Sequence, residues 1–395
     1  MTDPFSKIKS RFVDALLAVL PSHRPIALHE PSFIGNDSSY VQDCLSSGWV
    51  SSTGKYVDQF EEKLAEVTGA VAVVATMNGT SALHIGLIMA GVGRDDEVLI
   101  PALSFVATAN AVSHCGAIPH FVDVENVSFG MDPEGLRIYL TEIADVRGDR
   151  VINRKTGRRI GAMVPVHVFG HPARLTELLK ISEEFGIPLI EDAAESLGSW
   201  YKNKHTGTFG LCGALSFNGN KTITTGGGGA LLFNDVDLAR KAKHITTTAK
   251  ISHPWEFYHD SVAWNYRMPN LNAALGCAQL ERLPNILSSK RKLADRYKLA
   301  FADDPDISYV DEPLGSHSNF WLVAVLLASE SKELRDQLIV AANDLGIFVR
   351  PVWVLLCDLP MYRNCPSSTL ITSRKLQSSI INLPSSPSLL MNLQK

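Results

Sequence analysis

Short apolar runs alternate with segments of helical periodicity along most of this chain. Residues 71–76, 97–100 and 163–167 are such runs, and each precedes a segment whose apolar residues recur at helical spacing. Alternation of this kind is typical of an α/β domain, in which helices cover a mostly parallel sheet. The sequence therefore predicts an α/β fold with a mostly parallel, helix-covered sheet.

The alternation ends where a long helix begins, and this divides the chain. We expect residues 1–35 to form an N-terminal amphipathic helix and the segment after it, because Ile8, Phe12, Leu16 and Leu20 recur every fourth residue. Residues 36–277 are expected to form the large α/β domain. Residues 278–395 are expected to form a smaller α+β domain, with a strand over 320–327 and a helix over 333–345.

Composition excludes several classes of protein. The chain has 395 residues, of which 45% are hydrophobic and 20% charged, and its net charge is −4. This balance offers no basic field for nucleic acid. No run approaches the roughly 20 apolar residues that a membrane-spanning helix needs. No signal peptide and no metal-ligand cluster with usable spacing is evident. We therefore expect a cytoplasmic protein without a metal site.

Three of the predicted strands end in residues that can do chemistry. In a parallel sheet, ligands sit at the carboxyl ends of the strands. Asp192 supplies a carboxylate there and Lys221 supplies an amine. Residues 79–81 (GTS) can present backbone N–H groups at a helix N-terminus, where the dipole favours phosphate. Each has a plainer interpretation: a satisfied strand-end carboxylate, a surface lysine and an ordinary helix cap.

Taken together, these residues suit pyridoxal phosphate. That cofactor needs a lysine for a Schiff base, a carboxylate that keeps the pyridine nitrogen protonated, and a cup for its phosphate. The lysine must also lose its proton near neutral pH, which favours a partly desolvated site or one near other positive charge.

The motifs around these residues resemble a known family. Residues 191–198 (EDAAESLG), 207–210 (GTFG) and 216–229 (SFNGNKTITTGGGG) look like the DegT/StrS family of nucleotide-sugar aminotransferases. Residues 78–84 (NGTSALH) are similar to its phosphate loop, and 265–274 (NYRMPNLNAA) to its later signature. The resemblance implies a fold-type I pyridoxal phosphate-dependent transferase. Retention of Lys221 argues for transamination, because related dehydratases carry histidine there.

Within the family, the likeness is greatest to the LegC-type branch. Residues 29–35 (HEPSFIG), 246–250 (TTTAK), 253–256 (HPWE) and 359–362 (LPMY) all resemble that branch. This implies that L-glutamate donates an amino group to C4 of a UDP-linked 4-keto-6-deoxy-N-acetylhexosamine, giving a UDP-4-amino-4,6-dideoxy sugar for surface glycans. GDP-4-keto-6-deoxymannose is an alternative acceptor. A regulatory protein that binds the cofactor without turnover is an alternative from another class.

The resemblance also implies roles for single residues. Lys221 would form the Schiff base and shuttle the proton between the substrate carbon and the cofactor, and Asp192 would pair with the pyridine nitrogen. The remaining cofactor contacts would come from Gly79, Thr80 and Ser216 at the phosphate, Phe105 against the ring, and Glu195 near the phenolic oxygen. Phe105 could equally be a residue that packs in the core. Glu195 differs from the glutamine or histidine that many relatives have at this position.

The last group of implied contacts involves a second subunit and the sugar nucleotide. Asn265 would reach the phosphate of the neighbouring subunit's cofactor, which implies a homodimer with shared active sites. Basic and aromatic side chains suited to a diphosphate and a base are the candidate sugar-nucleotide contacts: Lys250, His253, Trp255, Arg267 and Arg350. Any single one of these is more often a solvated or packing residue.

Overall fold

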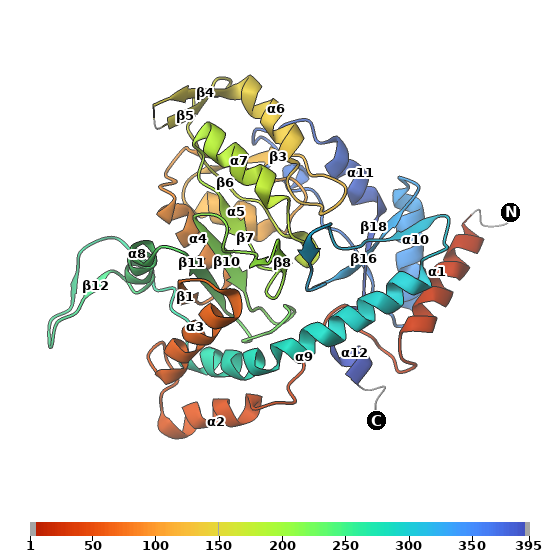
Figure 1. Cartoon of the computed structure of the whole chain (residues 1–395), viewed down its shortest axis with the longest axis horizontal. Helices are drawn as coiled ribbons and strands as arrows, with labels where there is room; N and C mark the ends of the chain where they lie inside the picture. Colours follow the sequence, from red (N-terminus) through yellow and green to blue (C-terminus); the bar gives the residue numbers. More distant parts are fainter. Residues whose placement is uncertain (1–4, 149, 392–395) are drawn as a thin grey trace.

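A twisted, mostly parallel sheet lies at the centre of the larger part of the molecule (Figure 1). The computed structural model describes residues 5–148 and 150–391. Four strands lie in the order β1-β11-β10-β7 and three in the order β3-β2-β6. Parallel bridges from Met163 to Leu189 and from Val166 to Asp192 join the two sets. Only β11 runs antiparallel to its neighbours here, which confirms the predicted sheet. The strands are β1 (Ala72–Thr76), β2 (Glu97–Pro101), β3 (Ile118–Val122), β6 (Ile160–Met163), β7 (Ile190–Asp192), β10 (Cys212–Ser216) and β11 (Gly229–Phe233).

Helices cover both faces of this sheet. They are α3 (Lys55–Thr68), α4 (Gly79–Met89), α5 (Val106–His114), α6 (Pro133–Ile143), α7 (Leu175–Phe185) and α8 (Val236–Thr246). Helix α3 shows why they form: Phe60, Leu64 and Thr68 recur every fourth residue on its buried face. Gly69, at φ 71°, then ends the helix in the left-handed conformation that glycine adopts without strain. The helical segments that the sequence predicts over residues 106–114 and 175–185 are α5 and α7, with those bounds.

The smaller part has its own sheet, in the order β14-β16-β18-β17. Its elements are β14 (Ile307–Tyr309), β16 (Val323–Leu327), α10 (Lys332–Asp344), β17 (Arg350–Pro351), α11 (Ile371–Ser379) and β18 (Ile380–Leu383). The predicted strand over 320–327 was wrong at its start, because Phe320 turns the chain with φ 46°. Helix α1 (Ser6–Val19) packs here: Phe12 and Leu16 are buried in one cluster with Tyr297 and Leu338.

Helix α9 (Asn270–Ala300) joins the two parts (Figure 1). Its first half packs with Phe60 and Leu64 of α3, and its second half packs with α1 and the small sheet. It crosses residue 277 without a break, so the division of the chain there stays a prediction.

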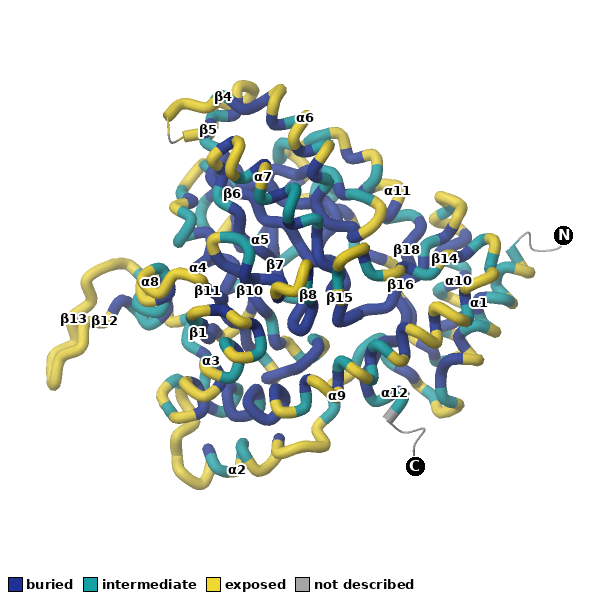
Figure 2. Tube along the Cα trace, viewed as in Figure 1, coloured by how far each residue is buried: buried dark blue, intermediate teal, exposed yellow. Residues whose placement is uncertain are grey.

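A long hairpin extends from the body of the molecule and is exposed over most of its length (Figures 1 and 2). It carries the short strands β12 (Lys250–Ile251) and β13 (Tyr258–His259). We call residues 250–262 the arm. The other elements are α2 (Asp37–Ser47), β4 (Ala144–Arg147), β5 (Arg150–Asn153), η1 (Val168–Gly170), β8 (Trp200–Tyr201), β9 (Lys204–His205), β15 (Ser316–His317), η2 (Leu356–Asp358) and α12 (Ser388–Met391). Across residues 5–148 and 150–391, no helix has the length and apolar character to cross a membrane.

Candidate active site

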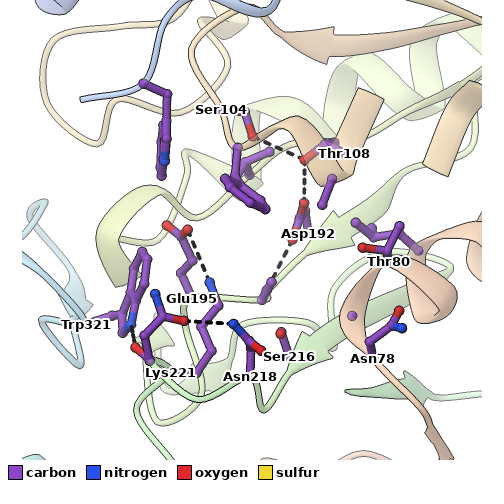
Figure 3. A pocket seen from close by; sticks show the side chains of 18 of the residues that line it. Asn78, Thr80, Ser104, Thr108, Asp192, Glu195, Ser216, Asn218, Lys221 and Trp321 are labelled. Atoms are coloured by element: carbon purple, nitrogen blue, oxygen red, sulfur yellow. Dashed lines mark hydrogen bonds and ion pairs between the residues drawn. The ribbon is translucent and has the colours of Figure 1, made fainter. Parts of the chain in front are cut away.

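A cavity of about 420 Å³ opens at the carboxyl ends of β1, β7 and β10. The large part supplies most of its wall, and the small part adds Trp321 and Trp353. The cavity brings together seven of the residues predicted from the sequence: Gly79, Thr80, Phe105, Asp192, Glu195, Ser216 and Lys221. Figure 3 shows the side chains of Glu195 and Lys221 turned toward one another, while Asp192, at the end of β7, faces Thr108.

The N-terminus of α4 forms one end of the cavity. Asn78 caps this helix, since its side-chain oxygen accepts a hydrogen bond from Ser81 N at 2.8 Å. Ser216 packs closely against Gly79: a Cβ added to Gly79 would lie 2.8 Å from the Cβ of Ser216. A Cβ on Gly229 would lie 2.4 Å from the carbonyl carbon of Asn78. Glycines thus let the chain approach closely around a helix end that favours an anion.

Asp192 is a buried carboxylate that has only neutral hydrogen-bond donors. Its Oδ2 accepts from Thr108 Oγ1 at 2.7 Å, and its Oδ1 accepts from Ala194 N at 3.2 Å. Burial raises the pKa of Asp192 above its usual range. Among the described residues no cation lies within ion-pair distance of it. A buried carboxylate favours a cationic partner, so this site suits a ligand that carries a protonated ring nitrogen.

Lys221 lies between an acid and an aromatic ring. Its Nζ is 3.4 Å from Glu195 Oε1 and 3.9 Å from the centroid of the Trp321 ring. The side chain is 12% exposed. The tip of Lys221 therefore lies within the cavity, within reach of a bound ligand (Figure 3).

Glu195 is also held by the backbone of η1. Its Oε2 accepts a hydrogen bond from Phe169 N at 2.9 Å. Phe169 has a φ of 57°, a conformation that costs free energy in a residue other than glycine and that often marks functional sites. Burial raises the pKa of Glu195 to about 7. This carboxyl group can therefore hold or release a proton near neutral pH.

The raised pKa of Glu195 predicts a pH dependence of stability in the cofactor-free protein. The folded chain holds the proton more tightly than the unfolded chain, so the free energy of unfolding should fall as pH rises from 4.5 to about 7. We expect this group to contribute a decline of about 2–3 kcal/mol. In Glu195→Gln the decline should be correspondingly smaller, as measured by denaturant unfolding between pH 4.5 and 8. Glu183→Gln, at an exposed position, is the control. Equal slopes in all three proteins would contradict the prediction.

Several residues of the cavity were given no role of their own from the sequence, although some lie within the quoted motifs. They are Asn78, Ser104, Thr108, Asn218, Asn220, Trp321 and Trp353. Ser104, two residues before α5, and Thr108, in its first turn, are four residues apart, and their hydroxyls lie 3.2 Å apart (Figure 3). That spacing, next to a strand end, is a signal that could have been used. Trp321 gave no such signal, because it reaches the cavity from the small part, 100 positions beyond Lys221.

Six predicted residues lie away from the cavity within this chain. Asn265 Oδ1 accepts a hydrogen bond from Arg267 Nε at 3.0 Å, and Arg267 lines a separate cleft with Lys243. The remaining four are exposed: Lys250, His253 and Trp255 lie on the arm, and Arg350 lies on β17. On the arm, Lys250 Nζ lies 4.1 Å from the centroid of Phe257, and His253 packs edge-on against Trp255.

Comparison with known proteins decides the family. The model of the DegT/DnrJ/EryC1/StrS aminotransferase family matches residues 32–394. The chain belongs to this family. It is 36% identical over 365 residues to a GDP-perosamine synthase of Vibrio cholerae, which covers 92% of this chain and 95% of that protein. The protein is thus a pyridoxal phosphate-dependent aminotransferase that acts on nucleotide sugars, as the sequence predicted.

Solved structures of DegT/DnrJ/EryC1/StrS aminotransferases have the same fold. A member from Brucella abortus superposes with a TM-score of 0.80 at 28% identity, covering 89% of this chain and 90% of that one. Helicobacter pylori PseC, an aminotransferase of pseudoaminic acid biosynthesis, superposes with a TM-score of 0.84 at 25% identity, covering 94% and 96%. These likenesses confirm the fold-type I architecture expected of this family.

The cavity also fits the cofactor of a DegT/DnrJ/EryC1/StrS aminotransferase. It offers a buried carboxylate without a cation, an amine that reaches inside, and a glycine-lined helix end suited to a phosphate. Asp192, Lys221 and the chain around Gly79 are therefore the residues that would hold pyridoxal phosphate.

Close packing at Gly79 gives a second prediction. In Gly79→Ala the new Cβ would meet Ser216 Cβ at 2.8 Å, so the start of α4 must move away from β10. We expect the dissociation constant of pyridoxal phosphate to rise about tenfold or more, since each 1.4 kcal/mol of lost binding is a factor of ten. Titration of the cofactor-free protein measures this. Gly219→Ala, where a Cβ meets nothing within 4 Å, is the control. Equal affinities of the two variants would contradict the prediction.

Proposed function

We propose that this aminotransferase moves the amino group of L-glutamate to C4 of a UDP-linked 4-keto-6-deoxy-N-acetylhexosamine. The product is a UDP-4-amino-4,6-dideoxy sugar for surface-glycan biosynthesis in the cytoplasm. The observation that carries the transamination is Lys221 Nζ inside the cavity, 3.4 Å from Glu195 Oε1. The choice of sugar is supported by the branch-like segments 29–35, 246–250 and 253–256.

Each residue of the cavity has a role in this proposal. Pyridoxal phosphate, when bound, supplies an electron sink. Asp192 would keep its ring nitrogen protonated, the chain at Gly79, Thr80 and Ser216 would bind its phosphate, and Phe105 would pack against the ring. Lys221 Nζ takes the proton from the carbon that bears the amine of the donor, as a general base, and later returns it. Glu195 Oε1, 3.4 Å from Lys221 Nζ, would hold a proton beside that lysine.

A second acceptor is favoured by the named relatives. The GDP-perosamine synthases of Vibrio cholerae and Escherichia coli O157:H7 are both 36% identical to this chain. GDP-4-keto-6-deoxymannose is therefore the alternative substrate. Both acceptors present a 4-keto-6-deoxyhexose to the same chemistry, and they differ in the nucleotide and at C2.

The two acceptors can be compared directly. The protein, loaded with pyridoxal phosphate and supplied with L-glutamate, is given each keto sugar in parallel, and mass spectrometry follows the aminated product. We expect kcat/KM for the UDP sugar to exceed that for the GDP sugar by about a hundredfold, within the range that pocket contacts achieve. A preference for the GDP sugar would replace this proposal with the alternative. Aspartate and alanine in place of glutamate test the donor.

We propose that the enzyme is a homodimer with shared active sites. This is supported by the position of Asn265 outside the cavity of its own chain and by the exposure of the arm. Trp255 and Phe257 on the arm are 77% and 81% exposed, which is unusual for aromatic side chains. A partner subunit would bring Asn265, Arg267 and the arm residues Lys250, His253 and Trp255 to the cavity. Arg350, on β17, is proposed to contact the nucleotide from within the same chain.

Complementation between inactive variants tests the shared site. Lys221→Ala and Asn265→Ala chains are produced together, each inactive alone. If Asn265 serves the partner's site, half of the dimers are mixed and each has one intact site, so activity returns to about a quarter of the wild-type value. If Asn265 serves its own site, the mixture stays inactive.

A further inference from the structure

A buried lysine that the proposed chemistry does not use lies behind the cavity wall. Lys290, on the second half of α9, is 1% exposed. Its Nζ donates to Ser385 O at 2.7 Å and to Trp321 O at 3.2 Å, and it is 3.0 Å from His29 Nε2. No carboxylate within the described part of the chain pairs with it. Burial lowers the pKa of Lys290 to about 7. Burying an amine costs free energy. The position of Lys290 and its three partners therefore need an explanation.

One of those partners is the main chain of a residue that touches Lys221. The Trp321 indole lies against Lys221 Nζ, and its Nε1 donates to Asn220 O at 2.7 Å (Figure 3). The ring thus contacts the Lys221 loop at two points. Where this ring sits depends on the backbone of Trp321.

That backbone is in a strained turn. Phe320 has a φ of 46°, which an aromatic residue adopts only where its surroundings hold it. On one side, Asn319 Oδ1 accepts from Trp321 N at 2.8 Å, while Asn319 Nδ2 donates to Glu195 O at 2.9 Å. On the other side, Lys290 holds Trp321 O. The turn at residues 319–321 is therefore fixed from both ends.

The segment containing His29 also contacts Lys290. Burial and the nearby charges of Lys290 and Lys221 lower the pKa of His29 well below its usual range, so its ring is neutral. A neutral imidazole can accept from Lys290. The backbone beside it is tied to the same place, because Ser385 N donates to Leu28 O at 2.7 Å. Lys290 thus joins three segments at the back of Trp321.

We propose that Lys290 is a positioning residue for transamination, which holds the Trp321 backbone so that the indole stays against Lys221. This inference rests on the role proposed for Lys221. It does not make Lys290 a catalytic residue, because Lys290 does not line the cavity.

A double-mutant cycle between Lys290 and Trp321 tests the inference. Lys290→Met keeps the apolar stem and removes the donors, Trp321→Phe removes the contact with Asn220 O, and Lys292→Met is the control at an exposed position of the same helix. We expect Lys290→Met to lower the rate of the glutamate half-reaction about tenfold, with the KM for glutamate within twofold. In the Trp321→Phe background the same change should lower the rate less than twofold, since residues that act as a unit are not additive. Independent, multiplicative losses would overturn the proposal.

A second measurement does not depend on activity. Hydrogen exchange of the cofactor-free protein, resolved by peptide, should show about tenfold faster exchange at 319–323 in Lys290→Met than in Lys292→Met, and unchanged exchange in 270–286 of α9. Uniformly faster exchange would mean a general structural role and would overturn the proposal. If Lys290→Met does not fold, Lys290→Gln, which keeps an amide donor, serves in both measurements. If the role proposed for Lys221 is wrong, the Lys221→Ala enzyme will be active. The exchange result does not depend on that role, so the two failures can be told apart.

Discussion

Replacing Lys221 with alanine is expected to lower the rate of transamination at least a thousandfold. Its Nζ is an amine placed within the cavity, and the variant would lose both the Schiff base and the proton carrier proposed for Lys221. General acid–base catalysis alone is worth about 10²–10⁴-fold. The conversion of the cofactor by L-glutamate, followed by its absorption spectrum, measures the half-reaction without any sugar.

The matched control for this prediction is Lys241→Ala, since Lys241 is exposed on α8. It should retain the wild-type rate. Lys221→Ala should still take up cofactor, because Asp192 and the chain at Gly79 remain. A wild-type protein that binds the cofactor but is unchanged by glutamate or other donors would favour a regulatory protein without turnover. A Lys221→Ala variant with wild-type activity would exclude Lys221 as the proton carrier.

The second large effect is expected from Asp192→Asn. The carboxylate would pair with the protonated ring nitrogen, and a hydrogen bond to a charged group is worth about 1.5–3 kcal/mol. We expect the half-reaction to slow by roughly 10- to 150-fold, with the pocket otherwise intact. Single-turnover kinetics with L-glutamate measure the rate, and cofactor titration measures the affinity.

Thr108→Val provides a graded comparison. It leaves the carboxylate in place and removes the hydrogen bond of 2.7 Å from Thr108 Oγ1 to Asp192 Oδ2. A neutral hydrogen bond is worth about 1 kcal/mol net, so this variant should lose roughly fivefold. Asp237→Asn, exposed at the start of α8, should lose nothing. If Asp192→Asn reacts as fast as Thr108→Val, the charge of Asp192 does not serve the reaction.

Much of this architecture could be predicted because it is local in the sequence. The helices over 106–114 and 175–185, which are α5 and α7, followed from helical periodicity. Asp192 and Lys221 could be found because Asp192 ends β7 and Lys221 lies in the loop after β10, and the ends of neighbouring parallel strands meet at one edge of the sheet. Motifs of the DegT/StrS family then tied these residues to one cofactor.

The rest depends on contacts between distant segments. Trp321 and Trp353 reach the cavity only after the small part has packed against the large one, and no periodicity records that packing. The strand start predicted at Phe320 was wrong because the left-handed turn there serves a tertiary contact, which overrides the apolar run. The cavity of a single chain does not include Asn265, so its predicted role needs a second subunit.

Helix α9 has a consequence for how the molecule melts. Its 31 residues extend about 46 Å. Side chains of its first half pack into the core around Phe60, and side chains of its second half pack into the core around Phe12. Neither core is complete without this helix, so loss of either would expose apolar surface in the other. Heating should therefore give a single cooperative transition with one calorimetric enthalpy for both parts. A chain cut near residue 277 should yield two fragments that fold only when mixed.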